Sequence, residues 1–353
     1  MVNKKYSLVP QTKFYDSMGA NWKSFIMYTQ HPNLRSKFCN TDKFGLRFNN
    51  SSNDFKQSDS IFDVNLDQNQ QNAVVVGGSF VFGEGATKDQ FTISSQLSKK
   101  TKFNFFNLGS RGHSGYQEIM SFLSHIDKLK NIKKIIIISG LNDLVLSNFI
   151  KTNDEQVSPI FGHDLFKSRM SEPTGWKAKI IKKTFGLFIE NVDWSRINYL
   201  NYKDEFLKII NSKKKSNFKN NYNNYLNVTI EKNLKIWSII SHGLNIPIYF
   251  ILQPNSIWQE KILSKTEKEI FSFAEKEKNF KKLYEHINED KYKILKKKIE
   301  SLSNQLKINF CDLNLILKDK KIKDTIWVDK IHMNDLGYEI VSNEIIKKIN
   351  LSH

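Results

Sequence analysis

The chain has 353 residues, enough for one large domain or for one domain with a sizeable insertion. Hydrophobic residues make up 39% of it and aromatic residues 12%, which indicates a globular protein. The net charge of +18 would normally suggest a nucleic acid or an anionic membrane as partner, but only five of the 54 basic residues are arginine. Lys, Asn, Ile and Phe, which all have AT-rich codons, are plentiful, as expected of a protein from an AT-rich genome. A solvated lysine surface therefore explains the charge. Attraction of anionic substrates or surfaces is the alternative.

Three further features bear on the compartment of the protein. Cys39 and Cys311 form no metal-binding or redox spacing. Residues 1–20 have a basic start but lack the apolar core of a secretory signal. No stretch approaches the roughly 18 uninterrupted apolar residues of a transmembrane helix. We therefore expect a cytoplasmic protein that binds no nucleic acid and has no transmembrane segment.

The first part of the chain differs in pattern from the rest. Residues 1–72 are polar and irregular, with scattered aromatic side chains. They are predicted to form an N-terminal lead-in that packs on a core domain of residues 73–353.

From residue 73 onward, short apolar runs alternate with helix-like stretches. The runs are continuously apolar, as expected for parallel strands that are covered on both faces: 73–77, 103–109, 133–140, 246–254 and 308–313. The intervening stretches have helical spacing: 89–100, 116–130, 229–243 and 282–306. This alternation predicts an α/β fold, an open five-stranded parallel sheet between helical layers.

Two regions depart from the simple alternation. Residues 144–228 separate the third and fourth predicted strands by more than a crossover helix requires, so they are predicted to be an insertion that shapes a binding site. Residues 256–306 are rich in Lys and Glu, with apolar positions at helical spacing. They are predicted to form one or two amphipathic helices.

The stretch "AVVVGGSFVFGEGA" at 73–86 places a serine between glycines after the first predicted strand. A phosphate-binding P-loop needs Lys-Ser or Lys-Thr after its last glycine, and Glu84 and Gly85 stand there instead. A dinucleotide fingerprint needs a third glycine where Lys88 stands. The G-x-S-x-G elbow of α/β-hydrolases needs a glycine where Val81 stands. The remaining interpretation is that Ser79 is a nucleophile of another serine-hydrolase architecture, or that it only caps the following helix.

Polar and glycine residues also follow the later strands. In open parallel sheets the ligand lies outside the carboxyl ends of the strands, so these residues belong together. After the second strand come Asn107, Gly109, Gly112 and Gly115; after the third, Gly140, Asn142 and Asp143; and near the C-terminus, Asp329 and His332. Taken singly, Asn142 could be a turn residue and His332 a surface histidine, but four such groups occur in order.

This set resembles the SGNH hydrolases, the GDSL esterase/lipase superfamily. The resemblance implies a flavodoxin-like three-layer α/β/α sandwich. It implies the catalytic residues Ser79, Asp329 and His332, and an oxyanion hole formed by the backbone N–H groups of Ser79 and Gly112 and the side chain of Asn142. The segment "TDKFGLRFN" at 41–49 is similar to the one that precedes the first strand in bacterial members with a Gly-Gly-Ser first block.

One position departs from the signature of that family. The signature has Asp before the serine, and here the residue is Gly78. A carboxylate at that position takes no part in the proton relay, so we expect activity to survive the change.

Arg111 and His113 flank Gly112 and are predicted to point into the pocket. Arg111 could bind a substrate carboxylate or phosphate bidentately, or it could be structural. No group of residues has metal-ligand spacing, so the sequence predicts no metal and no cofactor.

Three functional hypotheses follow. The first is a serine esterase that hydrolyses a small acyl ester, with acetyl as the expected acyl group, of a polar or carbohydrate-like substrate through an acyl-serine. The second is an O-acyltransferase that uses the same residues and passes the acyl group to an alcohol. The third is a non-catalytic binding protein on the same fold. The sequence leaves the acyl group, the alcohol and the oligomeric state open.

Overall fold

A computed structural model gives the structure of this chain. It describes residues 2–49, 54–64, 71–147, 222–259, 261–276, 284–319 and 322–351. The chain divides into two compact units, one made of Met1–Ser158 with Tyr222–His353 and the other of Pro159–Asn221. Most of the predicted insertion at 144–228, including the second unit, lies outside the described residues.

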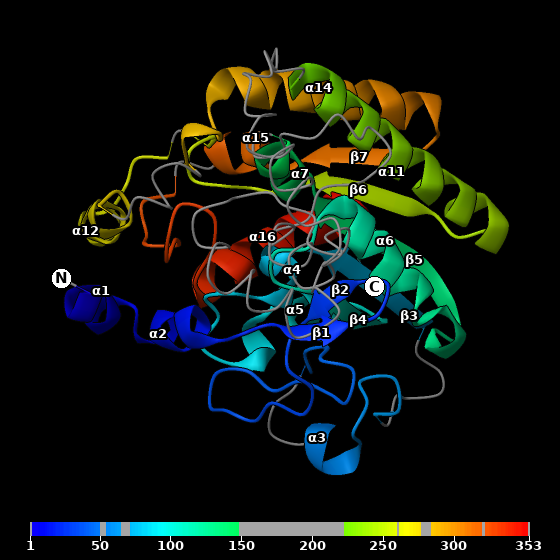
Figure 1. The fold of residues 1–353 in the computed structure, drawn as a ribbon, viewed down its shortest axis with the longest axis horizontal. Coiled ribbons are helices and arrows are strands. Elements are labelled where there is room, and N and C mark those ends of the chain that lie inside the picture. Colours follow the sequence, from blue (N-terminus) through cyan, green and yellow to red (C-terminus); the bar gives the residue numbers. More distant parts are fainter. Residues whose placement is uncertain are drawn as a thin grey trace, which may run out of the picture. The chain divides into compact units, whose positions relative to one another are not determined.

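Five parallel strands form the central sheet of the first unit (Figure 1). They are β3 (Gln71–Gly77), β4 (Phe103–Gly109), β5 (Ile132–Ser139), β6 (Ile248–Leu252) and β7 (Asn309–Asp312). The five predicted strands are confirmed to within two residues at either end. Their spatial order is β4-β3-β5-β6-β7, and all neighbouring pairs are parallel. This is the flavodoxin-like order, whose switch point lies between β3 and β5.

Helices follow the strands and fill the connections between them. Their bounds are α4 (Ser79–Phe82), α5 (Ile93–Lys100), α6 (Gly115–Leu123), α7 (Leu141–Leu146), α11 (Tyr222–Leu244), α12 (Lys265–Ala274), α14 (Glu289–Gln305), α15 (Leu313–Asp319) and α16 (Asp335–Lys348), with two 3-10 turns, η1 (Asp89–Phe91) and η2 (Ile126–Lys128). The segment predicted as one or two helices at 256–306 contains two, α12 and α14, among its described residues. The predicted helix at 89–100 is split, because Thr92 takes an extended conformation and caps α5 by accepting a hydrogen bond from the Ser95 N–H.

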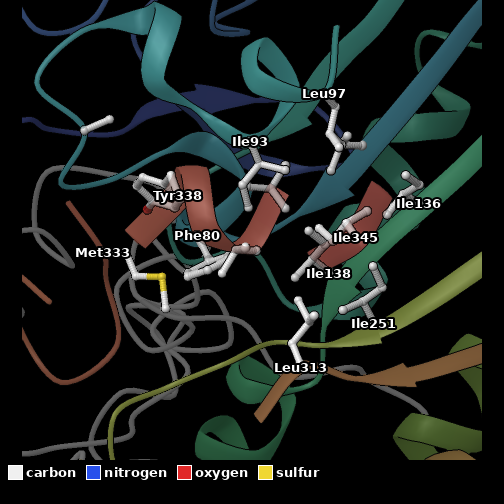
Figure 2. Close-up of a cluster of buried hydrophobic side chains, with 14 of the residues drawn as sticks. Phe80, Ile93, Leu97, Ile136, Ile138, Ile251, Leu313, Met333, Tyr338 and Ile345 are labelled. Atoms are coloured by element: carbon white, nitrogen blue, oxygen red, sulfur yellow. The ribbon is translucent and has the colours of Figure 1, made fainter. Parts of the chain in front are cut away.

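The core explains why the strands are continuously apolar. Alternate strand residues point to opposite faces, and both faces are covered. On one face, strand residues such as Val75, Ile136 and Ile138 pack with side chains of α5 and α16, and Figure 2 shows Ile136, Ile138 and Ile345 in this cluster. On the other face, α6 contacts β3 and β4, and α11 contacts β6. Phe122 of α6 meets Trp237 of α11 edge to face, with ring centroids 5.4 Å apart.

The N-terminal segment has more regular structure than its polar sequence suggests. It contains α1 (Val2–Leu8), α2 (Pro10–Ser17), a two-stranded antiparallel sheet of β1 (Asn21–Lys23) and β2 (Met27–Thr29), and α3 (Asp54–Gln57). Each element is short, so no long hydrophobic period marks it in the sequence.

Arg47, from the "TDKFGLRFN" segment, joins this lead-in to the turn that follows Ser79. Its guanidinium is fully buried, forms an ion pair with Asp89 at 2.7 Å, and donates to the backbone carbonyls of Phe82 and Gly83 at 3.1 and 2.8 Å. Removing one partner of a buried ion pair typically costs about 3–5 kcal/mol. The buried pair therefore fixes the end of α4 from the N-terminal side.

Candidate active site

Ser79 begins the short helix α4 directly beyond the carboxyl end of β3. Its carbonyl accepts hydrogen bonds from the backbone N–H groups of Gly83 and Glu84, both at 3.0 Å, which closes a tight turn. The side chain is left partly exposed at the edge of the sheet where ligands bind in this topology.

Asp329 and His332 lie on one loop that precedes α16. Asp329 Oδ1 accepts hydrogen bonds from the backbone N–H groups of Ile331 and His332, each at 2.7 Å. Its other oxygen, Oδ2, lies 2.7 Å from His332 Nδ1. The two-residue spacing in D-x-x-H thus lets one carboxylate hold both the backbone of the loop and the imidazole ring.

The structure brings this loop to Ser79 from 253 positions away in the sequence. His332 Nε2 lies 2.7 Å from Ser79 Oγ. An ionised carboxylate only accepts hydrogen bonds, so Nδ1 of His332 carries the ring proton and Nε2 accepts from the serine hydroxyl. Ser79, His332 and Asp329 therefore form one continuous chain of hydrogen bonds.

Electrostatics favour charge separation in this chain. Burial alone would lower the pKa of His332, but the carboxylates of Asp329 and Glu84 outweigh it and raise that pKa above its ordinary value. Burial alone would raise the pKa of Asp329, but His332 and the two backbone N–H groups hold it below its usual range. An imidazolium that forms at His332 is thus stabilised by its surroundings.

Asn142 and Gly112 reach the same edge of the sheet from two other loops. Asn142, the second residue of α7, donates through Nδ2 to the His113 carbonyl at 2.7 Å, which leaves its second amide hydrogen for another acceptor. Gly112 has a φ of 71°, a conformation that favours glycine, and its carbonyl accepts a hydrogen bond from the Tyr28 hydroxyl at 2.6 Å. Tyr28 therefore fixes the orientation of the peptide between Gly112 and His113.

The same geometry accounts for Gly78, the departure from the family signature. A Cβ atom added to Gly78 would lie only 2.7 Å from Asn142 Nδ2. Because the His113 carbonyl already holds this amide, the amide could not move away without losing its hydrogen bond. Glycine lets Asn142 approach the residue before Ser79.

Arg111 does not stand free beside Ser79. Its Nε and Nη2 donate to the two carboxylate oxygens of Glu84 at 2.8 and 3.0 Å, and its Nη1 donates to the Met18 carbonyl at 2.9 Å. The charge that would attract a substrate carboxylate is therefore already paired. Substrate binding by Arg111 remains a prediction.

His113 is fully buried and holds its loop against β2. Its Nε2 lies 2.9 Å from the Tyr28 carbonyl, which can only accept, so Nε2 carries the proton. Burial lowers the pKa of His113 to about 4, so the ring is neutral at physiological pH. The contacts of His113 are those of a positioning residue, and substrate binding by it also remains a prediction.

Two residues that the sequence did not single out as functional contact this site. Tyr28 orients Gly112, and no sequence pattern marked it. Glu84 lies with Oε2 3.7 Å from His332 Nε2. The signal for Glu84 was present, since a charged residue between two glycines, five positions after the candidate nucleophile, is unusual in an otherwise apolar turn.

The described part of the chain also bears on metal binding and membrane insertion. There, no group of three or more His, Cys, Asp or Glu side chains is placed to hold a metal ion. None of the described helices combines the length and apolar character needed to cross a membrane.

Known proteins similar to the chain are found only by structure. They include an α/β hydrolase from the metagenome of Lake Arreo, a lipase/acylhydrolase from Enterococcus faecalis and a member of the lipolytic G-D-S-L family from Veillonella parvula. Their identities to this chain are 8%, 11% and 9%, and their TM-scores are 0.41, 0.40 and 0.37. The matches cover 80%, 79% and 79% of this chain and 96%, 95% and 98% of those chains. No family model and no curated protein matches the chain. At such scores and identities, the function must be argued from the geometry of the site.

Proposed function

We propose that the protein is a serine esterase of the SGNH type that cleaves a small acyl ester through an acyl-serine intermediate. The observation that carries this proposal is the chain of 2.7 Å contacts from Ser79 Oγ to His332 Nε2 and from His332 Nδ1 to Asp329 Oδ2. A helix-capping serine would need no histidine, and a surface histidine would not be fixed by a partly buried carboxylate. A non-catalytic protein has no evident use for this arrangement.

In the proposed reaction, Ser79 Oγ attacks the ester carbonyl carbon while His332 Nε2 takes the hydroxyl proton. Asp329 holds the ring in the required tautomer and stabilises the imidazolium. The tetrahedral intermediate collapses, the bond to the alcohol oxygen breaks, and His332 returns the proton to that oxygen. The products of this half-reaction are the free alcohol and acyl-Ser79.

Three donors would stabilise the oxyanion: the backbone N–H groups of Ser79 and Gly112, and the second amide hydrogen of Asn142. Each donor of this kind is typically worth about 10²–10³ in rate. The His113–Asn142 hydrogen bond supports this role, because it fixes the Asn142 amide before substrate arrives. The Tyr28–Gly112 hydrogen bond holds the carbonyl side of Gly112 in the same loop.

The surroundings of Ser79 favour a polar substrate. The charged side chains of Glu84 and Arg111 border the serine–histidine pair and keep 13% and 22% of their surface exposed. An alkyl chain would have to desolvate this ion pair, whereas a short acyl group on a hydroxylated alcohol would not. We therefore propose a small acyl group, such as acetyl, on a polar or carbohydrate-like alcohol.

Reaction with a fluorophosphonate probe tests the proposal directly. The activated hydroxyl of Ser79 should take up one probe molecule per chain, and peptide mass spectrometry should place it on Ser79. Ser124→Ala, which changes an exposed serine at the end of α6, serves as a control and should label as the wild type does. Labelling that persists in Ser79→Ala would show that another residue is the nucleophile.

Asn142→Ala should lower kcat and kcat/KM for p-nitrophenyl acetate together by about 10²–10³, with KM little changed, because the lost donor meets a charge present only in the intermediate. Asn142→Asp should be at least as harmful, because its carboxylate would face both the oxyanion and the His113 carbonyl. Steady-state kinetics and the urea midpoint of unfolding check both variants.

A control for these two variants comes from α14. Asn288 caps this helix, so Asn288→Ala should cost about 0.5–2 kcal/mol of stability and leave kcat unchanged. If Asn142→Asp were merely destabilised and fully active, Asn142 would be a turn residue and not an oxyanion donor.

A further inference from the structure

Glu84 occupies a position that the acylation step does not explain. Its Oε2 lies 3.7 Å from His332 Nε2, the same nitrogen that contacts Ser79 Oγ. The carboxylate that orients the imidazole is Asp329, and it acts at the other ring nitrogen. A second carboxylate at the reacting nitrogen therefore needs another role.

Several contacts hold Glu84 in this place. Arg111 donates hydrogen bonds to both of its carboxylate oxygens. The backbone N–H of Glu84 donates to the Ser79 carbonyl, and the Glu84 carbonyl accepts from the Tyr338 hydroxyl at 2.6 Å. Burial alone would raise the pKa of Glu84, but Arg111 and His332 hold it below its ordinary value. At neutral pH Glu84 is thus a fixed, ionised group that can only accept hydrogen bonds.

The distance between Glu84 and His332 suits a shared water molecule. For a water oxygen about 2.8 Å from both Oε2 and Nε2, the Oε2–water–Nε2 angle would be about 83°. A water molecule can donate to both atoms at this angle through slightly bent hydrogen bonds. Such a water would donate one hydrogen to His332 and the other to Glu84. It would lie next to Ser79 Oγ, where the acyl group is attached.

We propose that Glu84 positions the water that hydrolyses acyl-Ser79. This inference rests on the esterase function proposed above. The water oxygen attacks the acyl carbon while one of its protons passes to His332 Nε2 and the other stays hydrogen-bonded to Glu84. The bond from the acyl carbon to Ser79 Oγ then breaks, His332 returns its proton to Oγ, and the carboxylic acid leaves with the second proton.

The arrangement also distinguishes water from an alcohol acceptor. A simple alcohol has a single hydroxyl hydrogen, and His332 must take it, so the alcohol has none left to donate to Glu84. Glu84 therefore assists water and gives no such help to an alcohol. On this basis the site favours hydrolysis over acyl transfer, and Glu84 is the residue that sets the preference.

Glu84→Gln tests the proposal with p-nitrophenyl acetate as the probe. The amide oxygen would turn toward the donors of Arg111, and the amide N–H₂ would face His332, where it cannot accept from water. Acylation, read from the p-nitrophenol burst, should slow only by the loss of the charge that Glu84 presents to the His332 imidazolium. Deacylation, read from the decay of the acetyl adduct by intact-protein mass, should slow by about ten- to a hundredfold more than acylation.

The pH profile separates this role from simple electrostatics. Glu84 contributes to the raised pKa of His332, so Glu84→Gln should move the acidic limb of the profile to lower pH. A residue that acted only through charge would shift the limb and, by destabilising the imidazolium, would lower the alkaline plateaus of acylation and deacylation by the same factor. The proposal requires the plateau of deacylation to fall further than that of acylation.

Partition between water and methanol gives an independent readout. In Glu84→Gln the share of acetyl groups transferred to methanol should rise severalfold over the wild type. Asp335→Asn is the matched control, because the Asp335 carboxylate accepts a hydrogen bond at 2.8 Å from the backbone N–H of Thr87, three residues after Glu84. It should deacylate and partition like the wild type.

The outcomes are distinct. A deacylation plateau that falls no further than the acylation plateau, with an unchanged methanol share in Glu84→Gln, would overturn the role of Glu84. Absence of both ester hydrolysis and fluorophosphonate labelling of Ser79 in the wild type would overturn the esterase proposal itself, and this inference with it. If Glu84→Gln fails to fold, Arg111→Lys replaces it. Loss of the bidentate Arg111–Glu84 contact should free the Glu84 carboxylate to move and slow deacylation in the same way. Deacylation at the wild-type rate in Arg111→Lys would then count against the proposal.

Discussion

Ser79→Ala should lower kcat for p-nitrophenyl acetate by about 10⁴–10⁶, because it removes the hydroxyl that lies 2.7 Å from His332 Nε2 and would carry the acyl group in the proposed reaction. The residual rate would come from the oxyanion donors and from binding alone. KM should change little, since the hydroxyl makes few contacts in the ground state. Stopped-flow and steady-state assays, with circular dichroism to verify folding, measure the effect.

The double variant Ser79→Ala/His332→Ala sharpens this result. Residues that act as one unit are not additive, so the double variant should be no slower than the slower of the two single variants. If the two losses multiplied, Ser79 and His332 would be acting separately, and their 2.7 Å contact would have no catalytic meaning.

Asp329→Asn should lower kcat by about 10⁴ with little loss of stability. Its side-chain oxygen can still accept from the backbone N–H groups of Ile331 and His332, so the loop should keep its shape. The new amide N–H₂ would then face His332 Nδ1 and force the ring proton onto Nε2. In that tautomer the ring donates to Ser79 and cannot act as its base.

The urea midpoint and the fluorophosphonate labelling rate test this explanation together. An unchanged midpoint with slow labelling fits the tautomer argument. A large fall in the urea midpoint would mean that the partly buried Asp329 carboxylate mainly stabilises the loop. Asp335→Asn, which removes a carboxylate at the start of α16, is again the control, and this variant should keep its activity.

The sheet was predictable because burial on both faces leaves a local signature. In β5 the four residues Ile135 to Ile138 form an unbroken apolar run that is fully buried, and no periodicity is needed to find it. The boundaries of the helices were less predictable. α11 begins at Tyr222, seven residues before its predicted start, because the Asn-rich sequence there lacks apolar spacing.

The residues of the candidate site could be located by one topological rule. Parallel strands bring their carboxyl ends to one edge, so residues far apart in the sequence, such as Ser79 and Asn142, could be placed together without knowing the helices. The roles assigned to them were carried by the family resemblance, and their catalytic action still awaits measurement.

What the sequence could not give were contacts between loops. The pairing of Arg111 with Glu84 joins positions 27 apart, and the support of Gly112 by Tyr28 joins positions 84 apart. Neither pair shares a local pattern. Arg111 therefore read as a substrate ligand when taken alone, and Glu84 served only to exclude a phosphate site.

The 253-residue separation of Ser79 and His332 has a consequence for the nascent chain. At typical synthesis rates the ribosome needs about 13–50 s to add His332 after Ser79. During that time β3 and its neighbours can form, but the hydroxyl has no base. Every product that stops before residue 329 should be hydrolytically inert, however well its sheet has folded. Activity in a cell therefore reports translation through the last turn before α16.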